Sequence, residues 1–221
     1  AGAGPHTLMP LINHIPDRFD VVGVTLPGRE SRSAENFTTT PSDPQAAVDA
    51  VLQEIVSLPA LPTVLFGHSM GAALAAAVAL SRPDPFTAVV LSAYPLGGSA
   101  AHRAGRWQDS EMLAIVRQGR GTPEEVTGSP AWRRRVLDLL RSDLTLSVRL
   151  VVGVGTRQPA VPVTVLCGDA DHVVATPDPV GWERNGDAAV RFRTFPGGHF
   201  YLLDEANMVE VATEISRAFA R

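Results

Sequence analysis

Three residues of this chain have the types and the order needed for nucleophilic acyl transfer: Ser69, Asp171 and His199. A serine hydroxyl is a poor nucleophile at neutral pH, so an imidazole must take its proton while the oxygen attacks a carbonyl carbon. A carboxylate bound to that imidazole fixes its tautomer and stabilises the imidazolium that forms. We therefore expect Ser69 to be the nucleophile, His199 the base and then the acid, and Asp171 the orienting carboxylate.

The residues around Ser69 predict a turn that would expose its hydroxyl. A short apolar run, Thr63 to Phe66, precedes the G-x-S-x-G pentapeptide of residues 67–71, and an Ala-rich segment with high helix propensity follows it. In that context the pentapeptide is typical of a nucleophile elbow, which presents the serine at a helix N-terminus. Gly67 and Gly71 suit such a turn because neither has a Cβ to obstruct it.

Each partner of the serine has a rival in the sequence. His172 is the rival base, although its place beside Asp171 in the chain would need an awkward path to reach Ser69. Asp169 is the rival acid, since both aspartates follow the same predicted strand, and Asp143 is a more distant one. His68 flanks the nucleophile and is expected to point below the elbow, where it would pack or form hydrogen bonds.

The oxyanion of the reaction needs preorganised hydrogen-bond donors. In an elbow one donor is the backbone N–H after the nucleophile, here Met70, and the other comes from a loop after an earlier strand. The candidate loop is Ala1-Gly2-Ala3-Gly4, whose small residues allow close backbone approach. The alternative is that these four residues are only a flexible chain end.

The elements that must position these residues alternate between strand and helix. Strands are predicted over Asp20–Leu26, Thr63–Phe66, Phe86–Leu91, Val161–Leu166 and Val190–Phe195, and helices over Pro44–Leu58, Ser110–Arg117, Trp132–Leu150 and Glu205–Ala220. This order predicts an α/β fold with a mostly parallel sheet flanked by helices. Residues 1–96 and 160–221 would form the core, and residues 97–159 a helical lid insertion. Ligands bind beyond the carboxyl ends of such strands, and Ser69, Asp171 and His199 each follow one.

The amino-acid composition excludes several classes of function and site. A chain of 221 residues with 45% hydrophobic residues fits one domain, and a net charge of −4 gives no general affinity for nucleic acid or membrane. The single cysteine, Cys167, excludes an internal disulfide and favours a reducing, cytoplasmic compartment. All nineteen basic residues are Arg, so catalytic lysine chemistry is excluded. His6, His14 and His102 have no ligand spacing, so neither a metal nor another cofactor is expected.

Five stretches carry a family resemblance: AGAGPHTLMPL at the start, LPGRESR at Leu26–Arg32, FGHSMGA around Ser69, CGDADHVV at Cys167–Val174 and FPGGHFYL at Phe195–Leu202. Together they resemble the type II thioesterases, stand-alone α/β-hydrolases that accompany polyketide synthases and nonribosomal peptide synthetases. The stretches run in the family's order along essentially the whole chain, and their combination is more specific than any one of them.

The resemblance implies hydrolysis of acyl groups held as thioesters on the phosphopantetheine arm of an acyl carrier or peptidyl carrier protein, which clears stalled units. It places Ser69, Asp171 and His199 on the catalytic triad, and Met70 and Ala1 on the oxyanion hole. We expect a monomer without a cofactor of its own, since the substrate carries the phosphopantetheine, although the sequence itself does not determine the oligomeric state. GTPEEV at Gly121–Val126 and LRSDL at Leu140–Leu144 resemble stretches of the family's lid.

Two features depart from the family. Relatives normally have a strand before the AGAG loop, so we expect residues upstream of Ala1 in the full protein. Ala93-Tyr94-Pro95 stands where relatives usually carry Arg-Ala-Pro, so the role of that arginine cannot be transferred to this chain.

The residues alone leave other functions open. A triad does not distinguish a thioester from an ester, or water from an internal hydroxyl, so a general carboxylesterase or a chain-releasing cyclase fits too. A function outside the enzymes is also possible: a hydrolase fold without catalytic activity that serves a synthase as a binding module. Six arginines make the insertion basic, either as a solvated helix face or as a surface that steers an acidic carrier protein: Arg103, Arg106, Arg133, Arg134, Arg135 and Arg141.

Overall fold

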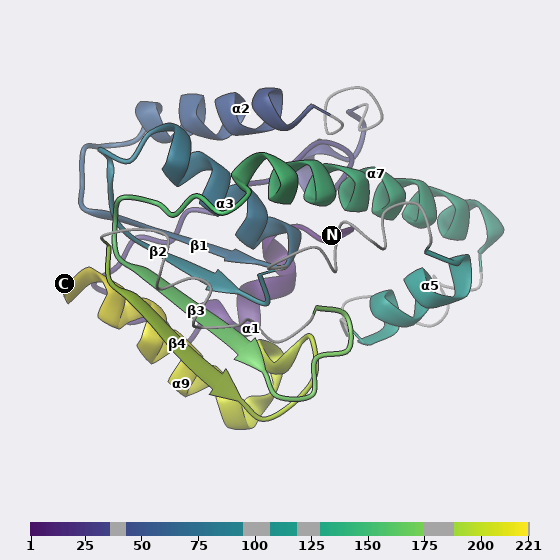
Figure 1. Cartoon of the computed structure of the whole chain (residues 1–221). Helices are drawn as coiled ribbons and strands as arrows, with labels where there is room; N and C mark the ends of the chain where they lie inside the picture. The colour runs from purple at the N-terminus through teal and green to yellow at the C-terminus, as the bar shows by residue number, and fades with distance from the viewer. Residues whose placement is uncertain (36–42, 95–106, 119–128, 175–187, 221) are drawn as a thin grey trace.

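The computed structural model describes residues 1–35, 43–94, 107–118, 129–174 and 188–220. Within them a four-stranded parallel sheet has the order β1-β2-β3-β4 (Figure 1). The strands are β1 (Thr63–His68), β2 (Phe86–Ser92), β3 (Val163–Gly168) and β4 (Val190–Phe195). All four carboxyl ends therefore meet at one edge of the sheet.

Helices cover both faces of the sheet (Figure 1). On one face lie α2 (Pro44–Ser57), α3 (Met70–Ser81) and α7 (Pro130–Val154), and on the other α1 (Met9–Ile12) and α9 (Glu205–Arg217). Successive residues of β2 point to opposite faces: Val89 and Leu91 pack in the cluster with α2, α3 and α7, whereas Ala88 and Val90 pack in the cluster with α1 and α9. Burial on both faces explains why Phe86–Leu91 reads as a nearly continuous apolar run.

The long helix α7 belongs to two apolar clusters. Its C-terminal half places Leu146 and Leu150 in the core against α3. Its N-terminal half packs with α5 (Asp109–Gln118), where Leu137 and Leu140 meet Met112. The segment predicted as one insertion therefore changes partners within a single helix.

Most elements predicted from the sequence are present within a few residues of their predicted bounds, and the parallel sheet flanked by helices is confirmed. The strand predicted over Asp20–Leu26 is wrong: this stretch forms no strand, and Val21, Val22 and Val24 are exposed. A strand is defined by a hydrogen-bonded neighbour, which apolar composition cannot reveal, and no described strand pairs with these residues.

Short 3-10 helices complete the described parts: η1 (Pro5–Leu8), η2 (Glu30–Arg32), η3 (Tyr201–Leu203) and η4 (Ala218–Ala220). The predictions for His102, Arg103, Arg106, Pro95 and Gly121–Val126 concern positions outside the described residues. In the described ranges, every helix is too short or too polar to cross a membrane.

Of the two elbow glycines, only Gly67 is required by close packing. A Cβ on Gly67 would lie 2.1 Å from the carbonyl oxygen of Gly71, a backbone atom that cannot move away. A Cβ on Gly71 would meet no described atom within 4 Å. Apart from its chain neighbours and the backbone of its own helix, Gly71 therefore has room for a side chain, whereas Gly67 does not.

We expect Gly67→Ala to lower the free energy of unfolding by about 3 kcal/mol or more, because strand and helix must separate to admit the methyl group. Gly71→Ala is the matched control and should be neutral or stabilising by up to about 1 kcal/mol, since alanine has the higher helix propensity. Urea unfolding of both variants measures the difference. Equal stabilities would contradict this description of the elbow.

Candidate active site

Ser69 occupies the turn between β1 and α3. Its backbone has φ 56° and ψ −118°, a conformation that is strained for a residue with a Cβ and typically costs 1–3 kcal/mol. Two backbone hydrogen bonds hold the turn: the N–H of Ser69 donates to the carbonyl of Ser92 (2.8 Å), and the N–H of Ala72 donates to the carbonyl of Ser69 (3.0 Å). The hydroxyl does not cap the helix, so it is available to another partner.

That partner is His199, on the loop after β4. Its Nε2 lies 3.0 Å from Oγ of Ser69, and its Nδ1 lies 2.8 Å from Oδ2 of Asp171. Because an ionised carboxylate only accepts, Nδ1 of His199 carries the hydrogen and donates, which leaves Nε2 to accept from the hydroxyl. The structure thus brings Ser69, Asp171 and His199 into one hydrogen-bonded chain from three strand ends.

The carboxylate of Asp171 is held by three donors. Besides His199, the backbone N–H groups of Val173 and Val174 donate to its Oδ1, at 2.8 and 3.0 Å. Burial by itself would raise the pKa of Asp171, but the hydrogen bond and charge of His199 and the two backbone donors together hold that pKa below its ordinary value. The group is therefore a carboxylate at neutral pH.

The rivals named from the sequence have other contacts. Asp169 accepts a hydrogen bond from the N–H of Gly197 (2.9 Å) and so ties the loop after β3 to the loop that carries His199. His172 is exposed on the wall of the adjacent cleft. Asp143 forms a buried ion pair with Arg29.

His68 lies beneath the elbow, as the sequence suggested, and belongs to a polar network that sequence reasoning missed. Its Nδ1 is 2.9 Å from Oγ of Ser92, which is 2.7 Å from the hydroxyl of Tyr201. Its ring lies 4.9 Å from the ring of His199. Ser92 ends β2 and Tyr201 closely follows His199. Their positions at the carboxyl edge of the sheet could therefore have predicted from the sequence that they lie near the site.

The environment of His68 favours the neutral imidazole. Burial, and to a lesser degree the neighbouring His199, set the pKa of His68 well below the ordinary 6.5. Its Nε2 is buried and has no hydrogen-bond partner among the described residues, so a proton there would be left unsatisfied.

The two residues expected at the oxyanion hole lie in different parts of the chain, at the start of α3 and in the loop of residues 1–4. Met70 begins α3 directly after Ser69 and is buried. Ala1 is half-buried and packs against both the main core cluster and the small cluster of α5 and α7. The loop that Ala1 begins is anchored to α7, because the N–H of Gly2 donates to Oδ2 of Asp143 at 2.6 Å.

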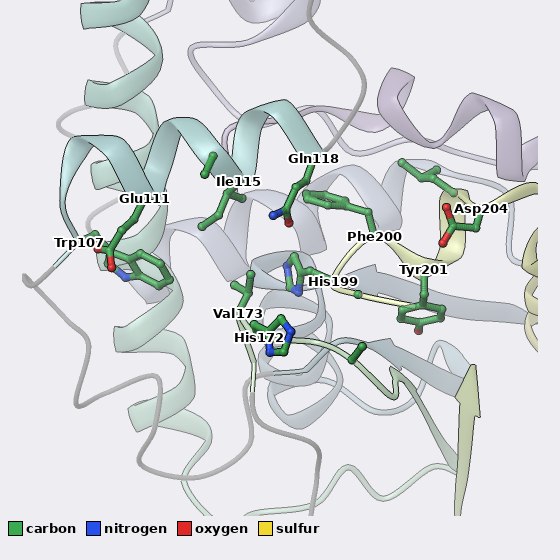
Figure 2. Close-up of a pocket in the computed structure, with 14 residues that line it drawn as sticks. Trp107, Glu111, Ile115, Gln118, His172, Val173, His199, Phe200, Tyr201 and Asp204 are labelled. Atoms are coloured by element: carbon green, nitrogen blue, oxygen red, sulfur yellow. The ribbon is translucent and has the colours of Figure 1, made fainter. Parts of the chain in front are cut away.

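A cleft of about 470 Å³ opens beside His199, between α5 and the loops that follow β3 and β4 (Figure 2). Its walls combine apolar side chains with a few polar ones: Trp107, Ile115, Val173, Phe200 and Leu203 with Glu111, Gln118, His172 and Asp204. In Figure 2 the side chains of α5 face the ring of His199 across this space. The apolar side chains give the cleft room for an apolar group next to His199.

Four of the six arginines of the predicted basic surface lie among the described residues, and two of these have contacts on the protein. Arg135 donates to the backbone carbonyls of Gly28 and Ser33, and Arg141 pairs with Asp109 and Asp138. Arg133 and Arg134 are exposed on α7.

The model of one protein family, the thioesterase domain, matches residues 1–219. The chain belongs to the thioesterase domain family. The match includes every residue of the hydrogen-bonded chain described above.

Similar curated proteins include the "Probable cadicidin biosynthesis thioesterase" of Streptomyces griseus, 30% identical over 90% of this chain. The chain spans 55% of the length of that relative. The medium-chain S-acyl fatty acid synthase thioesterase of Homo sapiens is 28% identical over 86% of this chain and 74% of its own length.

Solved structures agree on the architecture of this thioesterase-family chain. RedJ, a thioesterase from the prodiginine pathway of Streptomyces coelicolor, superposes with a TM-score of 0.73 at 25% identity, covering 99% of this chain and 87% of RedJ. BorB, the type II thioesterase of the borrelidin biosynthetic cluster, gives 0.71 at 25% identity over 100% and 88%. The predicted α/β-hydrolase fold and the predicted membership of a thioesterase family are confirmed.

We expect acid to destabilise the protein partly through His68. Since the pKa of His68 is lower in the folded than in the unfolded state, the unfolded chain binds more protons as the pH falls below 6.5, and the stability present at neutral pH is lost progressively from that pH down to the lower pKa of the folded state. Between pH 7.5 and 5.5 the loss should be about 1 kcal/mol. His68→Gln should show that much less acid destabilisation in urea unfolding; identical pH dependence in both proteins would contradict a neutral buried His68.

Proposed function

We propose that this chain is a serine thioesterase that hydrolyses acyl groups from the phosphopantetheine arm of carrier proteins. The observation that carries the proposal is the continuous hydrogen-bonded chain Ser69–His199–Asp171 beside an open cleft with both apolar and polar side chains in its walls. The family match supports a thioester substrate, and relatives named for cadicidin, gramicidin S and borrelidin biosynthesis support a carrier protein as the partner.

In the first half-reaction, Oγ of Ser69 attacks the thioester carbonyl carbon while Nε2 of His199 takes the hydroxyl proton. The negative charge that develops on the carbonyl oxygen is held by the backbone N–H groups of Met70 and Ala1. The carbon–sulfur bond then breaks, and the phosphopantetheine thiol leaves with the proton from His199. The acyl group remains as an ester on Ser69.

In the second half-reaction, water attacks the acyl ester on Ser69, and His199 takes a proton from that water. Collapse of the second tetrahedral intermediate breaks the bond to Ser69 and releases a free acid, and the proton returns to the serine. Throughout, Asp171 keeps the ring in one tautomer and stabilises its charged form. These residues suffice for the reaction without a cofactor, because the substrate brings its own phosphopantetheine.

The cleft suits the acyl part of such a substrate. Helix α5 and the N-terminal half of α7 form the lid in this proposal, and Trp107 and Ile115 supply apolar surface opposite His199. Release as a free acid would serve editing, since it clears carrier arms that hold a stalled acyl group.

The test compares an acyl carrier protein with a p-nitrophenyl ester of the same acyl group. The proposal expects the carrier-bound thioester to have a kcat/KM at least about 10-fold above that of the ester, since only the former offers the arm and the protein surface to bind. Ser69→Ala should reduce hydrolysis of the thioester by about 10³-fold or more. Preference for the ester would favour a carboxylesterase, and full activity of Ser69→Ala would reject the mechanism.

Two aspartates on the same loop provide a matched pair for the orienting role. Asp171→Asn should lower kcat by about 10²- to 10⁴-fold, because the amide can donate to Nδ1 of His199 and so favour the wrong tautomer. Asp169→Asn, which touches only the backbone of Gly197 among these groups, should stay within about 10-fold of wild type. A larger loss of kcat in Asp169→Asn than in Asp171→Asn would show that Asp169, and not Asp171, orients His199.

A further inference from the structure

A buried ion pair lies behind the loop at residues 1–4. Arg29 is 5% exposed and Asp143 is 0% exposed. The guanidinium donates through Nη1 to Oδ2 and through Nη2 to Oδ1 of the carboxylate, both at 2.8 Å. Such a paired, two-point contact fixes orientation as well as distance.

The same two side chains bind the backbone of the loop. The N–H of Gly2 donates to Oδ2 of Asp143 at 2.6 Å, and Nη1 of Arg29 donates to the carbonyl of Ala3 at 3.1 Å. Gly2 has φ 74°, and a Cβ on it would lie 2.8 Å from Cδ2 of Leu140 on α7. The loop is therefore bound through two of its peptide groups, Ala1–Gly2 and Ala3–Gly4, and packs closely against the helix.

Stability alone is a weak reason for this pair. Removing two charged groups from water is costly, and a buried ion pair can often be replaced by apolar side chains without loss of stability. Apolar replacements would fill the space but could not bind the peptide groups of Gly2 and Ala3. What Arg29 and Asp143 uniquely supply is a fixed position for that backbone.

Asp143 also lies where α7 changes partners. On its N-terminal side Leu137 and Leu140 pack with α5, and on its C-terminal side Leu146 and Leu150 pack in the core. The carboxylate therefore ties the loop to the helix that spans both clusters.

We propose that Arg29 and Asp143 are positioning residues for the oxyanion hole. By holding the peptide groups that follow Ala1, they orient the N–H of Ala1 toward the carbonyl oxygen of the bound thioester. This inference rests on the proposed function, because it needs Ala1 to be an oxyanion donor. It predicts that the pair acts on the chemical step more than on substrate binding.

Asp143→Asn is the first test, because it preserves volume but replaces one acceptor with an N–H group that faces Arg29 or Gly2. With an acyl carrier protein as substrate, kcat should fall by about 10- to 10²-fold, since a small misplacement of a catalytic donor has effects of that size. KM should stay within about 2-fold. The amide signal of Gly2 in a ¹⁵N–¹H spectrum should also move upfield as its short hydrogen bond to the carboxylate is lost.

Glu214→Gln is the matched control. Glu214 on α9 is 3% exposed and pairs with Arg191 at 3.0 Å, so the same chemical change is made in another buried carboxylate. It should lower thermal stability and leave kcat unchanged. A comparable fall in kcat in Glu214→Gln would show that lost stability, not lost positioning, explains the Asp143 variant.

The double variant Arg29→Met/Asp143→Leu separates the two roles if Asp143→Asn folds poorly. It should unfold at a temperature near that of wild type and still lose at least 10-fold in kcat. A folded double variant with wild-type kcat would overturn the positioning role while the proposed function stands. A wild-type protein that does not hydrolyse the acyl carrier substrate would instead overturn the proposed function itself.

Discussion

Everything at this site depends on the placement of one imidazole between an acceptor and a donor. The ring of His199 is bound at both nitrogens, by the carboxylate of Asp171 and by the hydroxyl of Ser69. Neither contact alone would suffice, since the carboxylate sets the tautomer and the tautomer decides whether Nε2 can accept a proton. The parallel sheet meets this requirement because its strands deliver their carboxyl ends to the same edge.

Close packing of two loops makes that placement rigid. A Cβ on Gly168, at the end of β3, would lie 2.5 Å from the carbonyl oxygens of both Gly197 and Gly198, so the loops after β3 and β4 touch through their backbones. Asp169 adds a hydrogen bond to the N–H of Gly197. This contact explains the glycine at position 168, whereas Gly197, at φ 118°, is explained by its backbone conformation.

The sequence was most informative where a structural feature depends on residues that are close together in the chain. Phe86–Leu91 could be predicted as a strand because both of its faces are buried, and the elbow could be predicted because its turn needs a small residue at Gly67. The candidate site could be predicted from the chain order of Ser69, Asp171 and His199, because each of them follows a predicted strand. The preference for Asp171 over Asp169 agrees with the observed geometry, in which Asp171 is the acid bound to His199.

Contacts between segments that are distant in the chain could not be predicted in this way, because they leave no pattern in the sequence. Arg29 and Asp143 are 114 positions apart, and each would pass for a surface charge in the sequence, although both are buried. From the sequence, Asp143 is a rival acid for the triad, and spacing does not reveal that its partner is Arg29. The error over Asp20–Leu26 has the same origin, because whether an apolar stretch becomes a strand depends on a neighbour that the stretch itself does not encode.

The central claim is that acyl groups pass through a covalent ester on Ser69, and rapid-quench mass spectrometry tests it most directly. Protein mixed with an acyl carrier substrate and quenched in acid within the first turnover should show a mass increase equal to the acyl group, located on the peptide that contains Ser69. Turnover without any such adduct, or an adduct on another residue that forms and decays at the rate of turnover, would contradict the account.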